Sequence, residues 1–249
     1  MSDCRTAVII PARWQSSRFP GKPLAQLAGK PMIRHVYAAA SRAEGVDITV
    51  VATDDERIRD AVLAFGGRAV MTSPDHSCGT ERAAECAEKL GLGPEDLVIN
   101  VQGDEPLLRP EEVLETAELL RTGDAPMSTL RCALREEKAL QDPNIVKVTV
   151  DLRGRAIAFS RSPIPYNRSG NPVTYWRHIG IYGYRMWFLE KYASLERGPL
   201  EEAELLEQLR ALENGYPILV GETRWHGAGV DTPEQLKEAE RLLRERMEN

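Results

Sequence analysis

Short runs of aliphatic and β-branched residues alternate with amphipathic stretches over the first 150 residues, and this alternation leaves the chain few folds. The runs that we expect to form strands are Ala7–Ile10, Ile48–Ala52, Ala69–Met71, Leu97–Val101 and Val146–Val150. Several are apolar at nearly every position, as strands are when helices cover both faces of a parallel sheet. The pattern therefore predicts an α/β fold.

Glycines mark where the intervening helices are expected to end, because glycine readily takes the left-handed conformation that follows a helix. Pro31 suits the first turn of one helix, and Gly45 lies beyond the end of that helix. Three further helices are expected, each followed by glycine: Asp55–Phe65, Thr80–Leu90 and Pro110–Arg121.

The second half of the chain follows a different pattern. We expect two strands and then two helices: Ala156–Ser160, Arg177–Tyr184, Leu200–Asn214 and Pro233–Glu248. This order is typical of an antiparallel addition to a parallel sheet. No Ser- or Gly-rich linker divides the chain, so we expect one domain over residues 1–249, with a sheet extension within about residues 155–215.

The expected helix over Leu200–Asn214 carries apolar residues at helical spacing. They predict a buried stripe made of Leu200, Ala203, Leu206 and Leu209. The Glu residues around this stripe are expected to form a solvated face.

Composition narrows the class of protein further. The chain has 249 residues, a net charge of −6 and four cysteines with no CxxC pair, which excludes a disulfide scaffold or a zinc ribbon. The first apolar run, Ala7–Ile10, is broken at once by Pro11, so we expect neither a signal peptide nor a membrane span, and a cytoplasmic location. The acidic balance argues against general binding to nucleic acid or membrane surfaces.

The loop from Pro11 to Pro23 is the segment richest in functional signals. It follows an expected buried strand, where open α/β sheets bind their ligands, and it carries the cations Arg13, Arg18 and Lys22. Small residues stand between them: Ser16, Ser17 and Gly21. Cations and exposed amides suit a triphosphate, although a solvated basic loop is the alternative. The spacing matches neither a P-loop nor a GxGxxG motif.

Two acidic segments offer ligands for a metal ion. In one, the strand Leu97–Val101 leads into Gln102 and Asp104, and in the other Asp231 precedes Thr232. Mg²⁺ prefers hard oxygen ligands, usually one or two carboxylates together with substrate phosphates. Taken alone, Asp104 also fits an ordinary turn, and Thr232 fits a helix cap. Asp231 joins the metal site only if the fold brings it near Asp104.

Other polar segments could contact a substrate. Asp75–Arg82 enters a helix and offers backbone donors and Arg82 to a base or phosphate. His76 and Cys78 lack the further ligands that a zinc site needs. Arg161 and His178 flank strand-like runs and suit an anionic, hydroxylated small molecule, although a lone histidine is more often structural.

Taken together, these segments resemble the 3-deoxy-manno-octulosonate cytidylyltransferases, also called CMP-KDO synthetases. The resemblance covers nearly the whole chain in order, through IIPARWQSSRFPGKPL, VATD, DHSCGTER, NVQGDEP, VKVTVD, AFSRSPIPY, RHIGIYGYR, LEEAELLEQLR and GVDTPEQL. The first loop is shared with many nucleotidyltransferases. The combination of NVQGDEP with FSR, RHIGIYGYR and GVDTPE is much more specific.

The resemblance implies a three-layer α/β/α fold like that of nucleotide-diphospho-sugar transferases, with a mixed, mainly parallel sheet and an antiparallel extension. It implies a homodimer that transfers CMP from CTP to the anomeric hydroxyl of 3-deoxy-D-manno-octulosonate (KDO), releasing pyrophosphate, for lipopolysaccharide biosynthesis. Mg²⁺ is the implied cofactor, and neither nucleic acid nor membrane is an expected partner. The alternatives are another acid sugar, sialic-acid-like or amino-KDO, and a non-catalytic nucleotide-binding regulator.

The resemblance also implies roles for residues of this chain. The implied catalytic residues are Arg13, Lys22, Asp104 and Asp231, of which Asp104 and Asp231 would hold the metal. The implied nucleotide-binding residues are Ala12, Arg13, Ser16, Ser17, Lys22, Gly79, Thr80, Arg82 and Gln102. The implied sugar-binding residues are Arg161, His178, Tyr182, Glu207 and Gln208.

Overall fold

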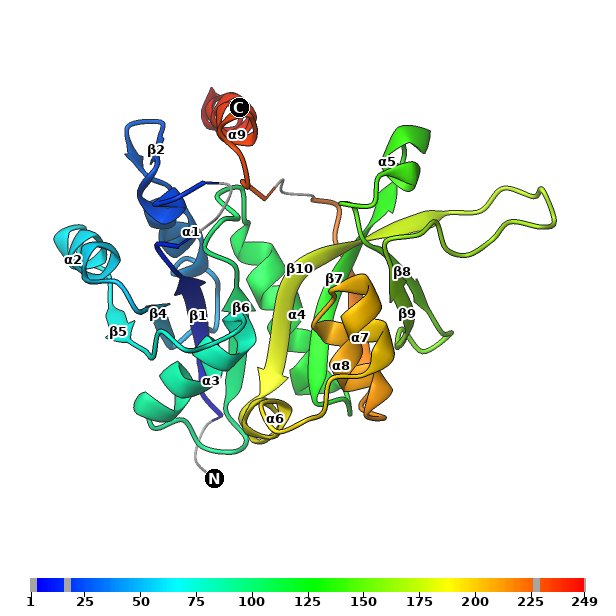
Figure 1. Cartoon of the computed structure of the whole chain (residues 1–249), viewed down its shortest axis with the longest axis horizontal. Coiled ribbons are helices and arrows are strands. Elements are labelled where there is room, and N and C mark those ends of the chain that lie inside the picture. Colours follow the sequence, from blue (N-terminus) through cyan, green and yellow to red (C-terminus); the bar gives the residue numbers. More distant parts are fainter. Residues whose placement is uncertain (1–3, 16–18, 226–228, 249) are drawn as a thin grey trace.

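Four of the five apolar runs form neighbouring parallel strands, as predicted (Figure 1). The structure is a computed structural model that describes residues 4–15, 19–225 and 229–248. The parallel strands, in their order across the sheet, are β6 (Leu97–Val101), β1 (Thr6–Ala12), β4 (Ile48–Thr53) and β5 (Ala69–Met71). Their carboxyl ends lie at one edge of the sheet, which sets the place of the site described below.

Antiparallel strands extend the same sheet on the other side of β6. The strand β10 (Tyr175–Arg185) runs antiparallel to β6 and to β7 (Met127–Leu134), and β11 (Ile218–Glu222) pairs with β7 in parallel. The fifth apolar run, β8 (Lys147–Val150), pairs antiparallel with β9 (Ala156–Ser160) and with β10. The predicted α/β fold with an antiparallel extension is therefore confirmed.

Helices cover both faces of the sheet. Successive residues of β1 point to opposite faces, and those on each face pack into a separate apolar cluster. Val8 and Ile10 pack in a cluster with α1 (Met32–Ala40), α2 (Glu56–Ala64) and α4 (Pro110–Thr122). Ala7 and Ile9 pack in the other cluster with residues of α3 (Gly79–Lys89), α6 (Met186–Tyr192) and α8 (Gln208–Glu213). Within the described ranges, no helix is both long and apolar enough to cross a bilayer.

The C-terminal helix α9 (Pro233–Glu248) packs against the short strand β2 (Gln26–Leu27). A third apolar cluster joins Ala239 of α9 to Leu27 and Met32, which lie in β2 and at the start of α1. Here β2 pairs with β3 (Lys30–Pro31). This packing anchors the segment just before α9, which contains Asp231.

The predicted single helix over Leu200–Asn214 is wrong. The structure has α7 (Pro199–Glu204) and α8 instead, separated where Leu205 takes the left-handed conformation with φ of 53°. Leu200 is 55% exposed, so it does not belong to a buried stripe. The expected solvated face is also wrong in part, because Glu201 is buried and makes two hydrogen bonds with Arg210.

Candidate active site

A cavity of about 780 Å³ opens at the carboxyl ends of β1 and β6. These strands are parallel neighbours, so the loops that follow them meet at the same edge of the sheet. The predicted residues that line the cavity are Ala12, Arg13, Lys22, Gly79, Arg82, Gln102, Asp104 and Asp231. The volume lies in the range of about 300–1,000 Å³ typical of small-molecule sites.

Lys22 stands between two carboxylates from distant parts of the chain. Its Nζ donates to Asp104 Oδ2 at 2.5 Å and to Asp231 Oδ1 at 3.0 Å. Burial acts to lower the pKa of Lys22, but the neighbouring Asp104 and Asp231 outweigh it, so the pKa is raised above its ordinary value. Lys22 is therefore a firmly charged ammonium group in the lining of the cavity.

The main chain holds these three residues in place. Gly21 has φ of 70°, a left-handed conformation that glycine takes without strain, and it leads directly into the turn η1 (Lys22–Leu24). The N–H group of Val230 donates to the Asp104 carbonyl at 2.9 Å, which fixes the segment of Asp231 beside the end of β6.

The donor set fits the predicted magnesium ion. Carboxylate oxygens of Asp104 and Asp231 both lie within hydrogen-bond distance of one atom, Lys22 Nζ, so they approach the same point. Among the described residues, no group of three or more His, Cys, Asp or Glu side chains is arranged to hold a metal. Two carboxylates completed by substrate phosphates are the usual way in which a protein binds Mg²⁺.

The start of α3 forms another wall of the cavity. Gly79 faces Gln102: a Cβ added to Gly79 would lie 3.4 Å from Gln102 Oε1. Arg82 also lines the cavity, but it is buried, and its guanidinium makes hydrogen bonds to neighbouring residues of the protein. It donates to Asp54 Oδ2 at 3.0 Å and to Thr72 Oγ1 at 2.6 Å.

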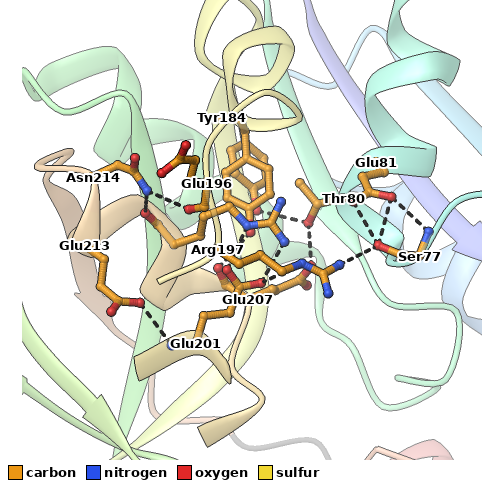
Figure 2. A network of polar contacts seen from close by, with 12 residues as sticks. Ser77, Thr80, Glu81, Tyr184, Glu196, Arg197, Glu201, Glu207, Glu213 and Asn214 are labelled. Atoms are coloured by element: carbon orange, nitrogen blue, oxygen red, sulfur yellow. Dashed lines mark hydrogen bonds and ion pairs between the residues drawn. The ribbon is translucent and has the colours of Figure 1, made fainter. Parts of the chain in front are cut away.

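Thr80 connects the predicted nucleotide side of the site to the predicted sugar side (Figure 2). Its Oγ1 donates to Glu207 Oε2 at 3.0 Å, between α3 and the α7–α8 connection. Burial raises the pKa of Glu207 above its ordinary value. Next to it in the sequence, Gln208 Oε1 accepts from the hydroxyl of Tyr182 at 3.1 Å. The two hydrogen-bonded pairs, Thr80 with Glu207 and Tyr182 with Gln208, thus lie next to each other and together are called the polar cluster.

His178 lies in the same region and is buried. Its Nε2 lies 2.9 Å from Thr129 Oγ1, and its ring centroid lies 5.5 Å from that of Tyr182. Burial, with a further contribution from Arg177, lowers the pKa of His178 to about 3. The imidazole is therefore neutral at physiological pH, and it suits hydrogen bonding rather than charge pairing.

Arg161 occupies a different position from the rest of the predicted sugar-binding residues. Its Nε donates to the Glu204 carbonyl at 2.7 Å and its Nη1 to the Pro143 carbonyl at 2.9 Å, so it ties the end of β9 to α7. None of the five predicted sugar-binding residues is among those that line the described cavity. Ser16 and Ser17, predicted for the nucleotide, lie outside the described residues.

Sequence reasoning missed Trp14 and the partner of Arg82, Asp54, and it considered His76 only as a zinc ligand. Asp54 follows β4 as Asp104 follows β6, so the same strand-end rule could have found it. His76 lines the cavity and its Nε2 lies 2.5 Å from Glu85 Oε2. Trp14 also lines the cavity, with the guanidinium of Arg57 over its ring. Nothing in the sequence indicates the last two contacts.

Comparisons with known proteins agree with this geometry. Residues 7–222 match the family model described as Cytidylyltransferase. A "3-deoxy-manno-octulosonate cytidylyltransferase" of Syntrophus aciditrophicus (strain SB) is 48% identical over 94% of this chain and 96% of its own length. An "8-amino-3,8-dideoxy-manno-octulosonate cytidylyltransferase" of Shewanella frigidimarina (strain NCIMB 400) is 46% identical over 96% of this chain and 98% of its own.

A solved structure is similar over the whole fold. The structure of a CMP:2-keto-3-deoxy-manno-octonic acid synthetase complexed with CTP has a TM-score of 0.92 and 44% sequence identity. The match covers 97% of this chain and 99% of that one.

Proposed function

Because this chain belongs to the cytidylyltransferase family, we propose that it transfers CMP from CTP to the anomeric hydroxyl of KDO and releases pyrophosphate. The observation that carries the proposal is the position of Lys22 between Asp104 and Asp231, in a cavity at the carboxyl ends of β1 and β6. A cation beside two carboxylates suits a nucleoside triphosphate that arrives with a divalent metal ion.

The chain's own residues would bind and orient the nucleotide. Lys22 and the exposed Arg13 would contact the phosphates, and their charge would stabilise the leaving pyrophosphate. The start of α3 and Gln102 would contact the rest of the nucleotide. The sugar hydroxyl attacks the α-phosphorus in line: an O–P bond forms, the bond to the β-phosphate oxygen breaks, and the hydroxyl proton is released.

Asp104 and Asp231 would hold Mg²⁺. When bound, this ion neutralises charge on the phosphate oxygens. Lys22 Nζ lies within ion-pair distance of both carboxylates, so it would remain next to the bound ion. The protein contributes mainly by positioning its charged groups, as in other phosphoryl-type transfers.

The polar cluster of Thr80, Tyr182, Glu207 and Gln208 would bind the acid sugar, with His178 beside it. Two buried polar atoms near this cluster have no hydrogen-bond partner within the described chain, Gln208 Nε2 and Asn100 Oδ1. Buried polar groups are normally satisfied. A hydroxylated ligand or an ordered water would complete these two groups, which favours a sugar over an apolar substrate here.

Pyrophosphate release with a panel of sugars tests the proposal and separates its alternatives. We expect CTP and Mg²⁺ to release pyrophosphate with KDO, and not with sialic acid or without sugar. A clear preference for 8-amino-3,8-dideoxy-manno-octulosonate would favour the activity named for the Shewanella relative. CTP binding in a calorimeter, with no pyrophosphate released for any sugar, would favour the non-catalytic regulator.

We further propose that the chain acts as one domain, in a homodimer, in the cytoplasm. A single domain is supported by the sheet, in which the antiparallel strands pair with the parallel ones. A cytoplasmic, reducing location is supported by the four cysteines, which are free thiols. Large apolar side chains are exposed around β8 and β9, namely Leu152, Ile157 and Tyr166. Such groups suit a protein interface. Sedimentation equilibrium would report a monomer if this part of the proposal is wrong.

A further inference from the structure

Trp14 packs between α2 and the turn that carries Lys22. The Cζ atom of Arg57, on α2, lies 3.5 Å from the centroid of the Trp14 ring. A Cβ added to Gly21 would lie 2.9 Å from Cη2 of the same ring, so the Gly21 main chain packs directly against it. Gly21 N also donates to the Trp14 carbonyl at 3.0 Å.

Arg57 is held in place independently of Trp14. Its Nε donates to Asp55 Oδ1 at 2.9 Å and its Nη2 to Asp55 Oδ2 at 2.6 Å. Asp55 is itself fixed, because its Oδ1 also accepts from the Arg57 main-chain N–H and caps α2. The guanidinium is thus oriented over the indole by a group at the start of a helix, and it offers a rigid support for the ring.

The contact reaches the candidate phosphate-binding cation through one residue. Gly21, which packs on the indole, precedes Lys22, whose Nζ is shared by Asp104 and Asp231. Arg57 is not among the residues that line the described cavity. We propose that Arg57 is a positioning residue for Lys22, acting through Trp14 and Gly21. The inference rests on the function proposed above, since it gives Lys22 a part in the reaction.

Steady-state kinetics of Arg57→Ala test this assignment. We expect kcat to fall about three- to tenfold, the loss that a stacked cation of this kind supports, while KM for the sugar stays unchanged. Arg57→Lys should recover part of the rate, because an ammonium retains some attraction to the ring. The matched control is Arg59→Ala, since Arg59 lies on the same helix but pairs with Glu56 and Asp60. Wild-type kinetics for Arg57→Ala would overturn the proposal.

A double-mutant cycle separates action through Trp14 from a direct effect of charge. In a Trp14→Ala background, Arg57→Ala should cause no further loss of kcat. If Arg57→Ala lowers kcat by the same factor with and without the indole, Arg57 does not act through Trp14 and the proposal is wrong.

Binding and fluorescence keep this test separate from the proposed reaction. The same double-mutant cycle is measured a second time on the Kd for CTP in the presence of Mg²⁺. In the Trp14→Ala background, Arg57→Ala should again have no effect on this Kd. The fluorescence of Trp14 is obtained by subtracting the emission of a Trp14→Phe variant. Iodide should quench this fluorescence more strongly in Arg57→Ala than in wild type, and no more strongly in Arg59→Ala. A wild-type protein that releases no pyrophosphate would refute the proposed function alone. Unchanged quenching in Arg57→Ala would refute the positioning role alone.

Discussion

Lys22 is the cation that the fold places most directly beside the predicted metal ligands. We expect Lys22→Met to lower kcat about a hundredfold or more, the usual loss when one preorganised donor is removed from developing charge. Lys30→Met is the control, because Lys30 is exposed and is not among the residues lining the cavity. Pyrophosphate release at saturating CTP and sugar measures both, and an unchanged kcat for Lys22→Met would remove Lys22 from the chemistry.

Asp104 and Asp231 should determine the response to magnesium. Asp104→Asn and Asp231→Asn keep side-chain size but remove charge, so each should raise the Mg²⁺ concentration needed for half-maximal rate and lower the maximal rate. Removal of divalent ions with a chelator should abolish turnover of the wild type. Asp60→Asn, on the exposed face of α2, should leave the Mg²⁺ titration unchanged. Near-normal rates in both site variants would contradict the metal assignment.

His178 should make the protein less stable as the pH falls. Its pKa is about 3 in the folded protein, against about 6.5 in an unfolded chain. Between these values the unfolded state binds the additional proton, so the free energy of unfolding decreases as pH decreases. His178→Asn removes this titration, although it loses the contact with Thr129 at pH 7.

Urea unfolding of wild type and His178→Asn between pH 7.5 and 4.5 measures this effect. The variant should be less stable at pH 7.5, by about 1 kcal/mol for one hydrogen bond. The difference should shrink as pH falls, by up to about 1.4 kcal/mol per pH unit below 6.5. A difference that stays constant with pH would mean that His178 is not held neutral.

Residues at strand ends were predictable from the sequence, whereas supporting contacts were not. Asp104 and Lys22 could be found because the loops that follow buried strands lie at the ligand-binding edge of the sheet. That Asp231 joins them depends on the packing of α9, which the sequence leaves open. The stacking of Arg57 on Trp14 joins residues more than forty positions apart and has no local signature.

Among the elements, the break between α7 and α8 is the clearest departure from the predicted pattern. Leu205 is a good helix former, and tertiary contacts override that preference. The Glu213 carboxylate accepts from the Leu200 and Glu201 N–H groups at the start of α7. Glu201 also pairs with the buried Arg210 of α8, so side chains of each short helix fix the position of the other.

The left-handed Leu205 predicts an unusual stabilising substitution. Its side chain is 78% exposed, so Leu205→Gly loses little packing and relieves a conformation that costs about 1–2 kcal/mol. The greater freedom of glycine in the unfolded chain offsets about 0.5–1 kcal/mol of that relieved strain. We expect a net gain of about 0.5–1 kcal/mol in urea unfolding. Leu200→Gly, also exposed but helical, should instead destabilise by about 1 kcal/mol, and destabilisation by both would contradict this account.

Predictable and unpredictable elements differ in their apolar content. The mainly apolar strands β1, β4 and β6 were predicted to within two residues, since burial on both faces favours such runs. The strands β7 and β11 were missed, because β7 mixes polar and apolar residues and β11 offers only Ile218–Val220 before a glycine.

At the scale of the whole molecule, net charge is a poor guide to the ligand. The chain carries a net charge of −6, yet the proposed substrates are both anions. Among the described residues around the cavity, the balance differs from that of the whole chain, because the three cations Arg13, Lys22 and Arg82 line it against only two carboxylates, Asp104 and Asp231. Many acidic residues lie on exposed parts of helices such as α9, where they pair with arginines of the same helix. Charge distribution, not its total, is therefore what favours an anionic nucleotide.

The fate of the α-phosphorus of CTP tests the central claim most directly. Phosphorus NMR would follow the protein with CTP, KDO and Mg²⁺, against controls without sugar and without protein. We predict a new phosphodiester signal, that of a CMP–sugar, and pyrophosphate in equal amounts, both dependent on KDO. No phosphodiester, or release of inorganic phosphate with formation of CDP, would contradict transfer of CMP to the sugar.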